Sequence, residues 1–243
     1  MPVQYHLVLA STSPRRREFL ALLGFPFTAV SPGVDGEIDE TPLPAEPPDR
    51  LVQRLSRLKA HTVAENLAAF SAIADLIETH HLIVIAADTV VVLDNAILGK
   101  PASPAEATQM LKSLRGRQHD VYSGLTLIHQ PPSIASKSKQ PIATYLYRSQ
   151  VWMRPYTDAE IAVYVAGGSP LDKAGAYGIQ DQPFAPVERL DGCFTSVMGL
   201  PLAQLAEGLD QTGLSLPEIS LLCSSHTGVT CCQAPSNHQP ARL

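Results

Sequence analysis

The sequence predicts an α/β protein built around a mixed β-sheet. Short apolar runs with the composition of buried strands alternate with segments that carry helix-capping residues, and this alternation is typical of the α/β class. The chain has 243 residues, of which 45% are apolar and 17% are charged. It is therefore able to bury a sizeable core, which argues against a mostly disordered chain.

The strands are predicted from apolar stretches that turn and loop residues interrupt. Asp94-Asn95 marks a turn, and the prolines, serines and lysines of residues 129–141 indicate a mobile hairpin tip. The expected strands are residues 7–10, 25–30, 83–93, 97–98, 121–128 and 144–153.

The helices are predicted from their caps and apolar faces. Ser13-Pro14 is a favoured helix start, and Ser103 and Thr157 each begin a capping box with a glutamate three residues later. The expected helices are residues 14–23, 50–66, 68–79, 104–115, 158–166 and 201–209, with loops at 31–49 and 169–192.

The last part of the chain has a different composition. From about Gln211 the apolar pattern fades into Ser, Thr, Pro, Cys and His. We therefore expect one domain over residues 1–210 and a disordered tail over residues 211–243.

Charge and cysteine content narrow the class of protein. The net charge of −5 disfavours a surface that coats nucleic acid or an anionic membrane, so an anion site must be a local cluster of Lys and Arg. Three of the four cysteines lie in the last 21 residues, which matches neither a disulfide framework nor a zinc site and indicates a reducing compartment.

The apolar runs are too short to span a bilayer, and the N-terminus lacks the order of a secretory signal. We expect a soluble cytoplasmic protein.

The strongest chemical signal is the segment from Ala10 to Arg17, which places three arginines in the first turn of a helix. The helix dipole is positive there, so each cation costs about 0.3–1 kcal/mol unless an anion binds. Ser11, Ser13, Arg15 and Arg16 with the free N–H groups of that turn would favour a phosphate. The alternative is a capped surface helix with solvated arginines.

Carboxylates supply the second signal. Asp88 interrupts an apolar strand pattern, where an ionised side chain is costly unless it is paired or bound to a metal. It could activate a water or hold a divalent cation, or simply cap local N–H groups. Asp35, Glu37, Asp39 and Glu40 form an acidic loop, from which one residue is expected to contribute to the site and the others to be solvated.

Three lysines are further candidates for contacts with an anion. Lys59 follows a leucine pattern at helical spacing, Lys100 follows the expected hairpin, and Lys173 precedes a segment rich in Gly and Ala. Glycines there would let a ligand approach the backbone closely. Each could equally be an ordinary surface lysine with its stem along apolar surface.

Six segments follow one another in a recognisable order: residues 9–17, 87–92, 98–101, 116–119, 170–180 and 199–202. Together they resemble the Maf family of nucleoside triphosphate pyrophosphatases. The resemblance implies an ITPase-like, two-lobed fold with a mixed β-sheet flanked by helices, a cleft between the lobes, and often a homodimer. It also implies hydrolysis of a nucleoside triphosphate to the monophosphate and pyrophosphate with a divalent cation.

The same resemblance implies roles for individual residues. Asp88 matches the family's proton acceptor, and Arg15, Thr89 and Gln180 match positions tied to substrate choice. Asp88-Thr89 and the segment from Lys173 to Tyr177 are similar to the branch that acts on dTTP and UTP. In the expected mechanism Mg²⁺ or Mn²⁺ is held by Glu37 or Asp35 together with Asp88.

Three positions depart from the family pattern. Gly36 separates two carboxylates that are usually adjacent, Asp181 replaces a usual glycine, and Ser196 stands where asparagine is common. Two alternatives therefore stay open beside the dTTP/UTP hypothesis. One is a regulator of septum formation that binds nucleotide or nucleic acid without turnover. The other is the same chemistry on 7-methyl-GTP or modified nucleotides.

Overall fold

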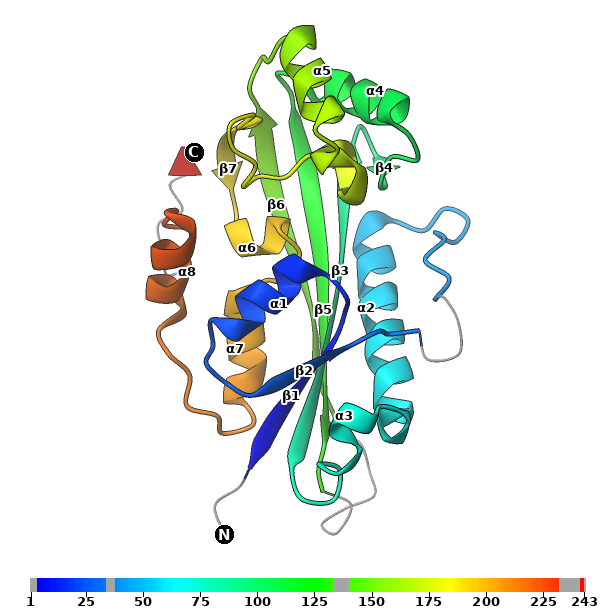
Figure 1. The fold of residues 1–243 in the computed structure, drawn as a ribbon, viewed down its shortest axis with the longest axis vertical. Coiled ribbons are helices and arrows are strands. Elements are labelled where there is room, and N and C mark those ends of the chain that lie inside the picture. The colour runs from blue at the N-terminus through cyan, green and yellow to red at the C-terminus, as the bar shows by residue number, and fades with distance from the viewer. Residues whose placement is uncertain (1–3, 34–37, 133–139, 232–240, 243) are drawn as a thin grey trace. The chain divides into compact units, whose positions relative to one another are not determined.

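The computed structural model describes residues 4–33, 38–132, 140–231 and 241–242, and for 140–142 and 241–242 it describes the backbone alone. Figure 1 shows the helices and strands of the chain as a ribbon. The chain divides into two compact units, each made of several segments. Unit 1 comprises residues 1–88, 124–146 and 199–219, and unit 2 comprises residues 89–123, 147–198 and 220–243.

The strands form one mixed sheet in the order β2-β1-β3-β5-β6-β7-β8, with β4 paired to β3. β1 is parallel to both β2 and β3, whereas β4, β7 and β8 pair in antiparallel fashion with β3, β6 and β7. The mixed sheet that the sequence predicts is thus confirmed. The strands are β1 Tyr5–Ala10, β2 Phe27–Val30, β3 His81–Leu93, β4 Ala96–Leu98, β5 Gln118–Gln130, β6 Gln140–Met153, β7 Val187–Asp191 and β8 Ala241–Arg242.

Helices and short 3-10 turns connect these strands. The α-helices are α1 Pro14–Ala21, α2 Pro48–Glu65, α3 Ser71–Ala74, α4 Pro104–Leu114, α5 Asp158–Ala166, α6 Phe194–Val197, α7 Leu202–Asp210 and α8 Ile219–Thr227. The 3-10 turns are η1 Leu67–Ala69, η2 Ser169–Asp172 and η3 Ala174–Ala176. No helix of the described segments is long and apolar enough to cross a lipid bilayer.

In unit 1 the apolar face of α2 covers β1 and the first part of β3. Ala60 and Val63 of α2 belong to one buried cluster with Val8 of β1 and Val84 of β3. The helix also approaches β5 closely, because a Cβ atom on Gly124 would lie 2.3 Å from the backbone oxygen of Val52. This packing fixes the side chains that α2 directs toward the end of β3.

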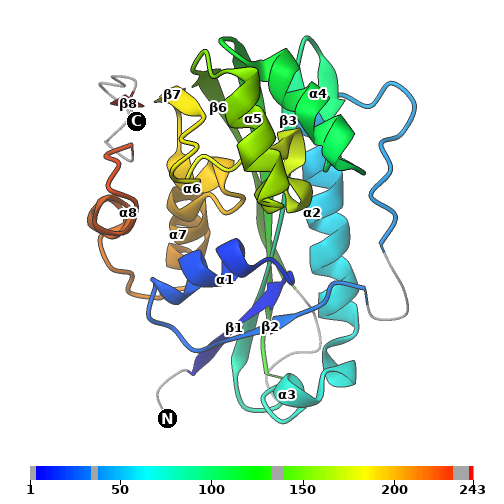
Figure 2. The same ribbon diagram turned by 45° about the horizontal axis from the view of Figure 1, so that its top comes forward.

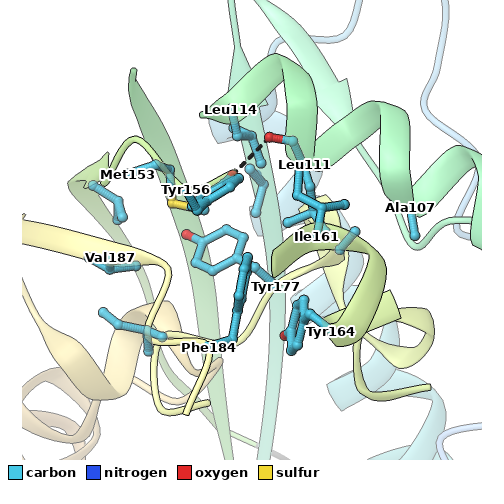
Figure 3. Packing of buried hydrophobic residues seen from close by; sticks show 14 of the residues in the cluster. Ala107, Leu111, Leu114, Met153, Tyr156, Ile161, Tyr164, Tyr177, Phe184 and Val187 are labelled. Atoms are coloured by element: carbon cyan, nitrogen blue, oxygen red, sulfur yellow. Dashed lines mark hydrogen bonds between the residues drawn. The ribbon is translucent and has the colours of Figure 1, made fainter. Parts of the chain in front are cut away.

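In unit 2, α4 and α5 lie side by side (Figure 2) and enclose a core of their own (Figure 3). The Tyr156 hydroxyl donates to the carbonyl of Leu111 at 2.8 Å, which joins the approach to α5 to the middle of α4. The predicted capping box at Thr157 is present in both directions with Glu160. Tyr164 stacks on Phe184 with ring centroids 4.1 Å apart, so α5 also holds the loop that precedes β7.

Several sequence predictions of secondary structure are wrong. Residues 68–79 form only η1, α3 and turns, and β7 lies in the loop-rich segment 169–192, where the sequence predicts no strand. α6 was not predicted, and α8 lies where the sequence indicates a disordered tail. α8 buries Cys223, and the following Val229 packs against the core of unit 2, so apolar burial orders this segment although Ser, Thr and Pro surround its short apolar run. Most of the predicted hairpin tip lies outside the described residues.

Candidate active site

A buried ion-pair cluster lies in unit 1 where α2 meets the middle of β3. The Lys59 ammonium is 2.6 Å from Oδ1 of Asp88 and 2.6 Å from Oε1 of Glu40. Lys59 is 5% exposed and Asp88 is 6% exposed, whereas the Glu40 side chain is 57% exposed. The cluster therefore carries two carboxylates against one ammonium, with Glu40 on the side of solvent.

Burial and charge act on Asp88 in opposite directions. Removal from water raises the pKa of the Asp88 carboxyl, while the Lys59 ammonium and the Arg16 guanidinium oppose that rise. The net direction is upward, which makes this carboxylate a better proton acceptor than an ordinary aspartate. A shifted acid that is held by a specific cation is typical of functional sites.

The N-terminus of α1 belongs to the same electrostatic neighbourhood of unit 1. Ser13 is the N-cap residue, but its side chain makes no capping hydrogen bond, so the first-turn N–H groups keep their capacity to bind an acceptor. Arg16 is half-buried, with Nε donating to the Gly199 carbonyl at 2.9 Å and Nη1 donating to Ser11 Oγ at 3.3 Å. Burial lowers the pKa of Arg16, and Asp88 and Glu40 counteract this.

The other residues of this turn are less enclosed. Arg15 is half-buried, and Arg17 is exposed. Ser11 Oγ accepts from the backbone N–H of Ser13 at 3.2 Å, which shapes the loop between β1 and α1. The structure thus brings Ser11, Ser13 and Arg16 together as the sequence predicts, with Arg17 directed to solvent.

The acidic loop contributes Glu40, one of the four carboxylates from which the sequence predicts a single contribution. Asp35 and Glu37, which are predicted to hold a metal ion together with Asp88, lie outside the described residues. Asp39 accepts from the backbone N–H of Thr41 at 2.9 Å and is exposed, whereas Glu40 reaches Lys59. Within the described residues no three His, Cys, Asp or Glu side chains form a group that could hold a metal ion.

In unit 2, Thr89 belongs to a chain of hydroxyl groups. Its Oγ1 is 2.8 Å from Oγ of Ser123, and Ser123 donates to the backbone carbonyl of Ser196 at 2.8 Å. Ser123 and Ser196 are fully buried, while Thr89 is half-exposed. An isolated serine inside a strand carries no sequence pattern, so Ser123 was not predicted.

Gln180 lies in a tight turn of unit 2 that Asp181 closes. The backbone N–H of Asp181 donates to the Gly178 carbonyl at 3.1 Å, and the Asp181 carboxylate accepts from Ser169 Oγ at 2.9 Å and from the Tyr164 hydroxyl. Asp181, a departure from the family pattern, therefore anchors the turn. Gln180 itself is half-buried.

The two remaining lysines differ in their surroundings. Lys100 is exposed. Lys173 is 8% exposed, and its ammonium donates to Ser169 O at 2.5 Å and to Asp172 Oδ1 at 2.8 Å. Its hydrogen bonds hold the chain around η2, which is the role of a structural anchor.

Another pair missed by sequence reasoning supports unit 2 from within. His119 Nε2 and the Tyr177 hydroxyl are 2.7 Å apart, and both side chains are buried. Burial lowers the pKa of His119 to about 3, so the imidazole is neutral at physiological pH. The pair joins the start of β5 to the segment that follows Lys173.

Residues 6–212 match the model of the family described as Maf-like protein. The chain belongs to the Maf family. Its resemblance to that family, inferred from the six sequence segments, is confirmed.

Curated relatives cover nearly the same part of the chain. This Maf protein is 41% identical to the dTTP/UTP pyrophosphatase of Moorella thermoacetica over 86% of its own length and 96% of that protein. It is 40% identical to the protein of the same name from Dictyoglomus turgidum, over 86% of its own length and 97% of that protein. It is 39% identical to the one from Aromatoleum aromaticum, over 88% of its own length and 99% of that protein.

Solved structures show only a partial likeness to this chain. The Ham1 protein of Staphylococcus aureus matches with a TM-score of 0.35 and 14% identity over 61% of this chain and 71% of that one. A HAM1 protein from Coxiella burnetii matches with a TM-score of 0.38 and 16% identity over 63% and 75%.

Proposed function

We propose that this Maf-family protein is a nucleoside triphosphate pyrophosphatase that hydrolyses dTTP and UTP to the monophosphate and pyrophosphate. The observation that carries the proposal is Asp88, a buried carboxylate with a raised pKa that Lys59 holds in place beside the cationic turn of α1. The choice of substrate is supported by relatives named dTTP/UTP pyrophosphatase, because the chain matches each of them over almost its full length.

The triphosphate is proposed to bind at the N-terminus of α1. The N–H groups that Ser13 leaves uncapped, the Ser11 hydroxyl and the guanidinium groups of Arg15 and Arg16 all favour oxyanions. Binding of the substrate also relieves the unfavourable interaction between the helix dipole and its arginines. In unit 2, the exposed Lys100 is proposed as a further cationic residue for the substrate, and Lys173 is proposed to act through the segment that it anchors.

Asp88 is proposed to accept a proton from the attacking water. The water oxygen forms a bond to the α-phosphorus as the bond between that phosphorus and the bridging oxygen breaks, and pyrophosphate leaves with the bridging oxygen. The raised pKa of Asp88 brings the carboxylate closer to the basicity that proton transfer needs near neutral pH. Lys59 fixes the orientation of the carboxylate, so positioning and fixed charge supply most of the acceleration.

We propose that a divalent cation, Mg²⁺ or Mn²⁺, takes part in the reaction, as the family resemblance implies. Asp88 and Glu40 present oxygen atoms to the same ammonium nitrogen, and carboxylate oxygens are the ligands that hard cations prefer. Asp88 and Glu40 would hold the cation, with Asp35 or Glu37 as the further proposed ligands. When bound, the cation would neutralise charge on the triphosphate oxygens.

The base is proposed to be read by Thr89 and Gln180 of unit 2. Thr89 directly follows Asp88 in β3, and Gln180 lies in a turn that Asp181 anchors. Hydrogen-bonding sites discriminate well because a wrong base leaves buried polar groups unpaired.

The test is incubation of the full chain with a panel of nucleotides and either Mg²⁺ or Mn²⁺. We expect pyrophosphate and monophosphate from dTTP and UTP, and a loss of about 10²–10⁴-fold in kcat for Asp88→Asn. Asp75→Asn, which changes an exposed aspartate of unit 1, is the matched control and should retain full turnover.

Three results would overturn the proposal. Orthophosphate as product would place the attack at the γ-phosphorus. Preferred hydrolysis of 7-methyl-GTP would assign the protein to another substrate class. Nucleotide or DNA binding that Asp88→Asn leaves unchanged, without turnover by the wild type, would indicate a regulator of septum formation.

We also propose that the protein works in the cytoplasm as a homodimer, as the family resemblance implies. None of the described cysteines forms a disulfide, which is consistent with a reducing compartment. Light scattering of the protein as it elutes from a size-exclusion column measures its mass. A monomer at micromolar concentration would contradict the proposed homodimer.

A further inference from the structure

The hydroxyl chain of unit 2 has a direction that the positions of its atoms determine. Ser123 donates its single hydroxyl proton to the Ser196 carbonyl, which can only accept. The contact of 2.8 Å between Ser123 Oγ and Thr89 Oγ1 then requires that Thr89 supply the proton. The Thr89 hydroxyl therefore has its proton occupied and offers only lone pairs to a ligand.

Burial makes this direction difficult to reverse. Ser123 and Ser196 are both 0% exposed, so no solvent reaches the two inner links of the chain. The Ser196 carbonyl belongs to the four-residue helix α6 and accepts from the backbone N–H of Met198 as well as from Ser123, so its position is fixed on both sides. If Thr89 turned its proton to a ligand, the buried Ser123 oxygen would lose its donor, and such unpaired groups are unfavourable.

We propose that Ser123 is a positioning residue that keeps the Thr89 hydroxyl a hydrogen-bond acceptor, so that the site selects a base with an N–H group at the position facing Thr89. This inference rests on the proposed function. Uracil and thymine carry an N–H at ring position 3, whereas cytosine carries a lone pair there. The lone pair of cytosine would repel the lone pairs of the Thr89 oxygen. The hydroxyl chain therefore selects uridine and thymidine nucleotides over cytidine nucleotides.

The exposure of the residues in the hydroxyl chain agrees with this positioning role. Thr89 is half-exposed, and it is the outer end of the chain of hydroxyls. Its neighbour Ser123 cannot touch a ligand because it is enclosed, so it acts only through Thr89. A substitution of Ser123 should therefore change the choice of base and leave the chemistry at Asp88 intact.

The experiment compares kcat/KM for UTP and CTP in the full-length chain. In Ser123→Ala the Thr89 hydroxyl can rotate and donate to cytosine, so the ratio of UTP to CTP should fall by about tenfold, chiefly because CTP improves. In Thr89→Val the acceptor is lost, so kcat/KM for UTP should fall about tenfold, while Thr89→Ser retains the wild-type ratio. Adding Ser123→Ala to Thr89→Val should change the ratio no further.

The control is Ser149→Ala, which removes another fully buried hydroxyl of unit 2, one that accepts from the backbone N–H of Cys193 at 3.2 Å. It should lower stability without changing the ratio of UTP to CTP. If Ser123→Ala does not fold, Ser123→Cys, whose thiol is only a weak hydrogen-bond acceptor, takes its place in the same comparison and should lower the ratio of UTP to CTP in the same direction.

The outcomes separate the two proposals. A wild type that hydrolyses no pyrimidine triphosphate overturns the proposed function and this inference with it. A wild type that prefers UTP while Ser123→Ala retains the same preference overturns the inference and leaves the proposed function standing. Equal loss with both substrates in Ser123→Ala assigns Ser123 a purely structural role and also overturns the inference.

Discussion

His119 should make the folded protein sensitive to acid. Burial lowers the pKa of its imidazole from 6.5 to about 3, and the side chain is 3% exposed beside Tyr177. Below pH 6.5 the unfolded chain takes up a proton that the folded chain does not, so the free energy of unfolding falls as the pH falls from 6.5 toward 3. At pH 5 the expected loss from this residue is about 2 kcal/mol.

The assay is unfolding in urea at about pH 7.5 and about pH 5, followed by the fluorescence of Trp152. This residue is the single tryptophan of the chain and lies in unit 2 with His119. On going from the higher to the lower pH, the free energy of unfolding of the wild type should fall by about 2 kcal/mol more than that of His119→Gln. His61→Gln, which changes an exposed histidine of α2, should lose as much as wild type. If wild type and His119→Gln lose stability in parallel, the imidazole is not held neutral by burial.

Three further substitutions test the packing around the site. Lys59→Met should cost about 3–5 kcal/mol of stability in a urea titration, because it leaves Asp88 buried without its nearest counter-charge; a loss below about 1 kcal/mol would mean that the pair is solvated. Gly124→Ala should prevent folding, as judged by circular dichroism, because its Cβ would lie 2.3 Å from a backbone oxygen of α2. The control is Gly99→Ala, whose Cβ meets nothing within 4 Å, and this variant should fold normally. Asp181→Ala should raise KM for UTP with little change in kcat, because it frees the turn that carries a base-reading residue; an unchanged KM would contradict this.

Local signals in the sequence account for most of the fold. The capping box at Thr157 and the Ser103 cap each depend on residues three positions apart, so the start of each helix can be read without tertiary information. β7 and α6 escaped prediction because they are short and lie among prolines and glycines. α8 escaped because its apolar run, residues 219–223, is short and lies in a tail rich in Ser, Thr and Pro, and its order depends on the burial of Cys223.

The candidate site was predictable only in part. Asp88, Lys59 and Arg16 stood out as individual residues, since a carboxylate in an apolar strand and cations in a helix turn are locally unusual. Their partnership is not local: Lys59 and Asp88 are 29 positions apart, and the Ser123 contact with Ser196 spans 73 positions. Such pairings follow from the packing of α2 and the course of β5, which periodicity does not report.

The division of the chain into interleaved units has a consequence for synthesis on the ribosome. The chain passes between the units five times, and the last segments belong to residues 199–219 for unit 1 and 220–243 for unit 2. Neither half can therefore complete its core while the C-terminal fifth is still within the exit tunnel, although N-terminal domains commonly fold first during translation. Nascent chains halted before about residue 199 should remain sensitive to protease along their whole length, and a premature stop there would leave no surviving folded module.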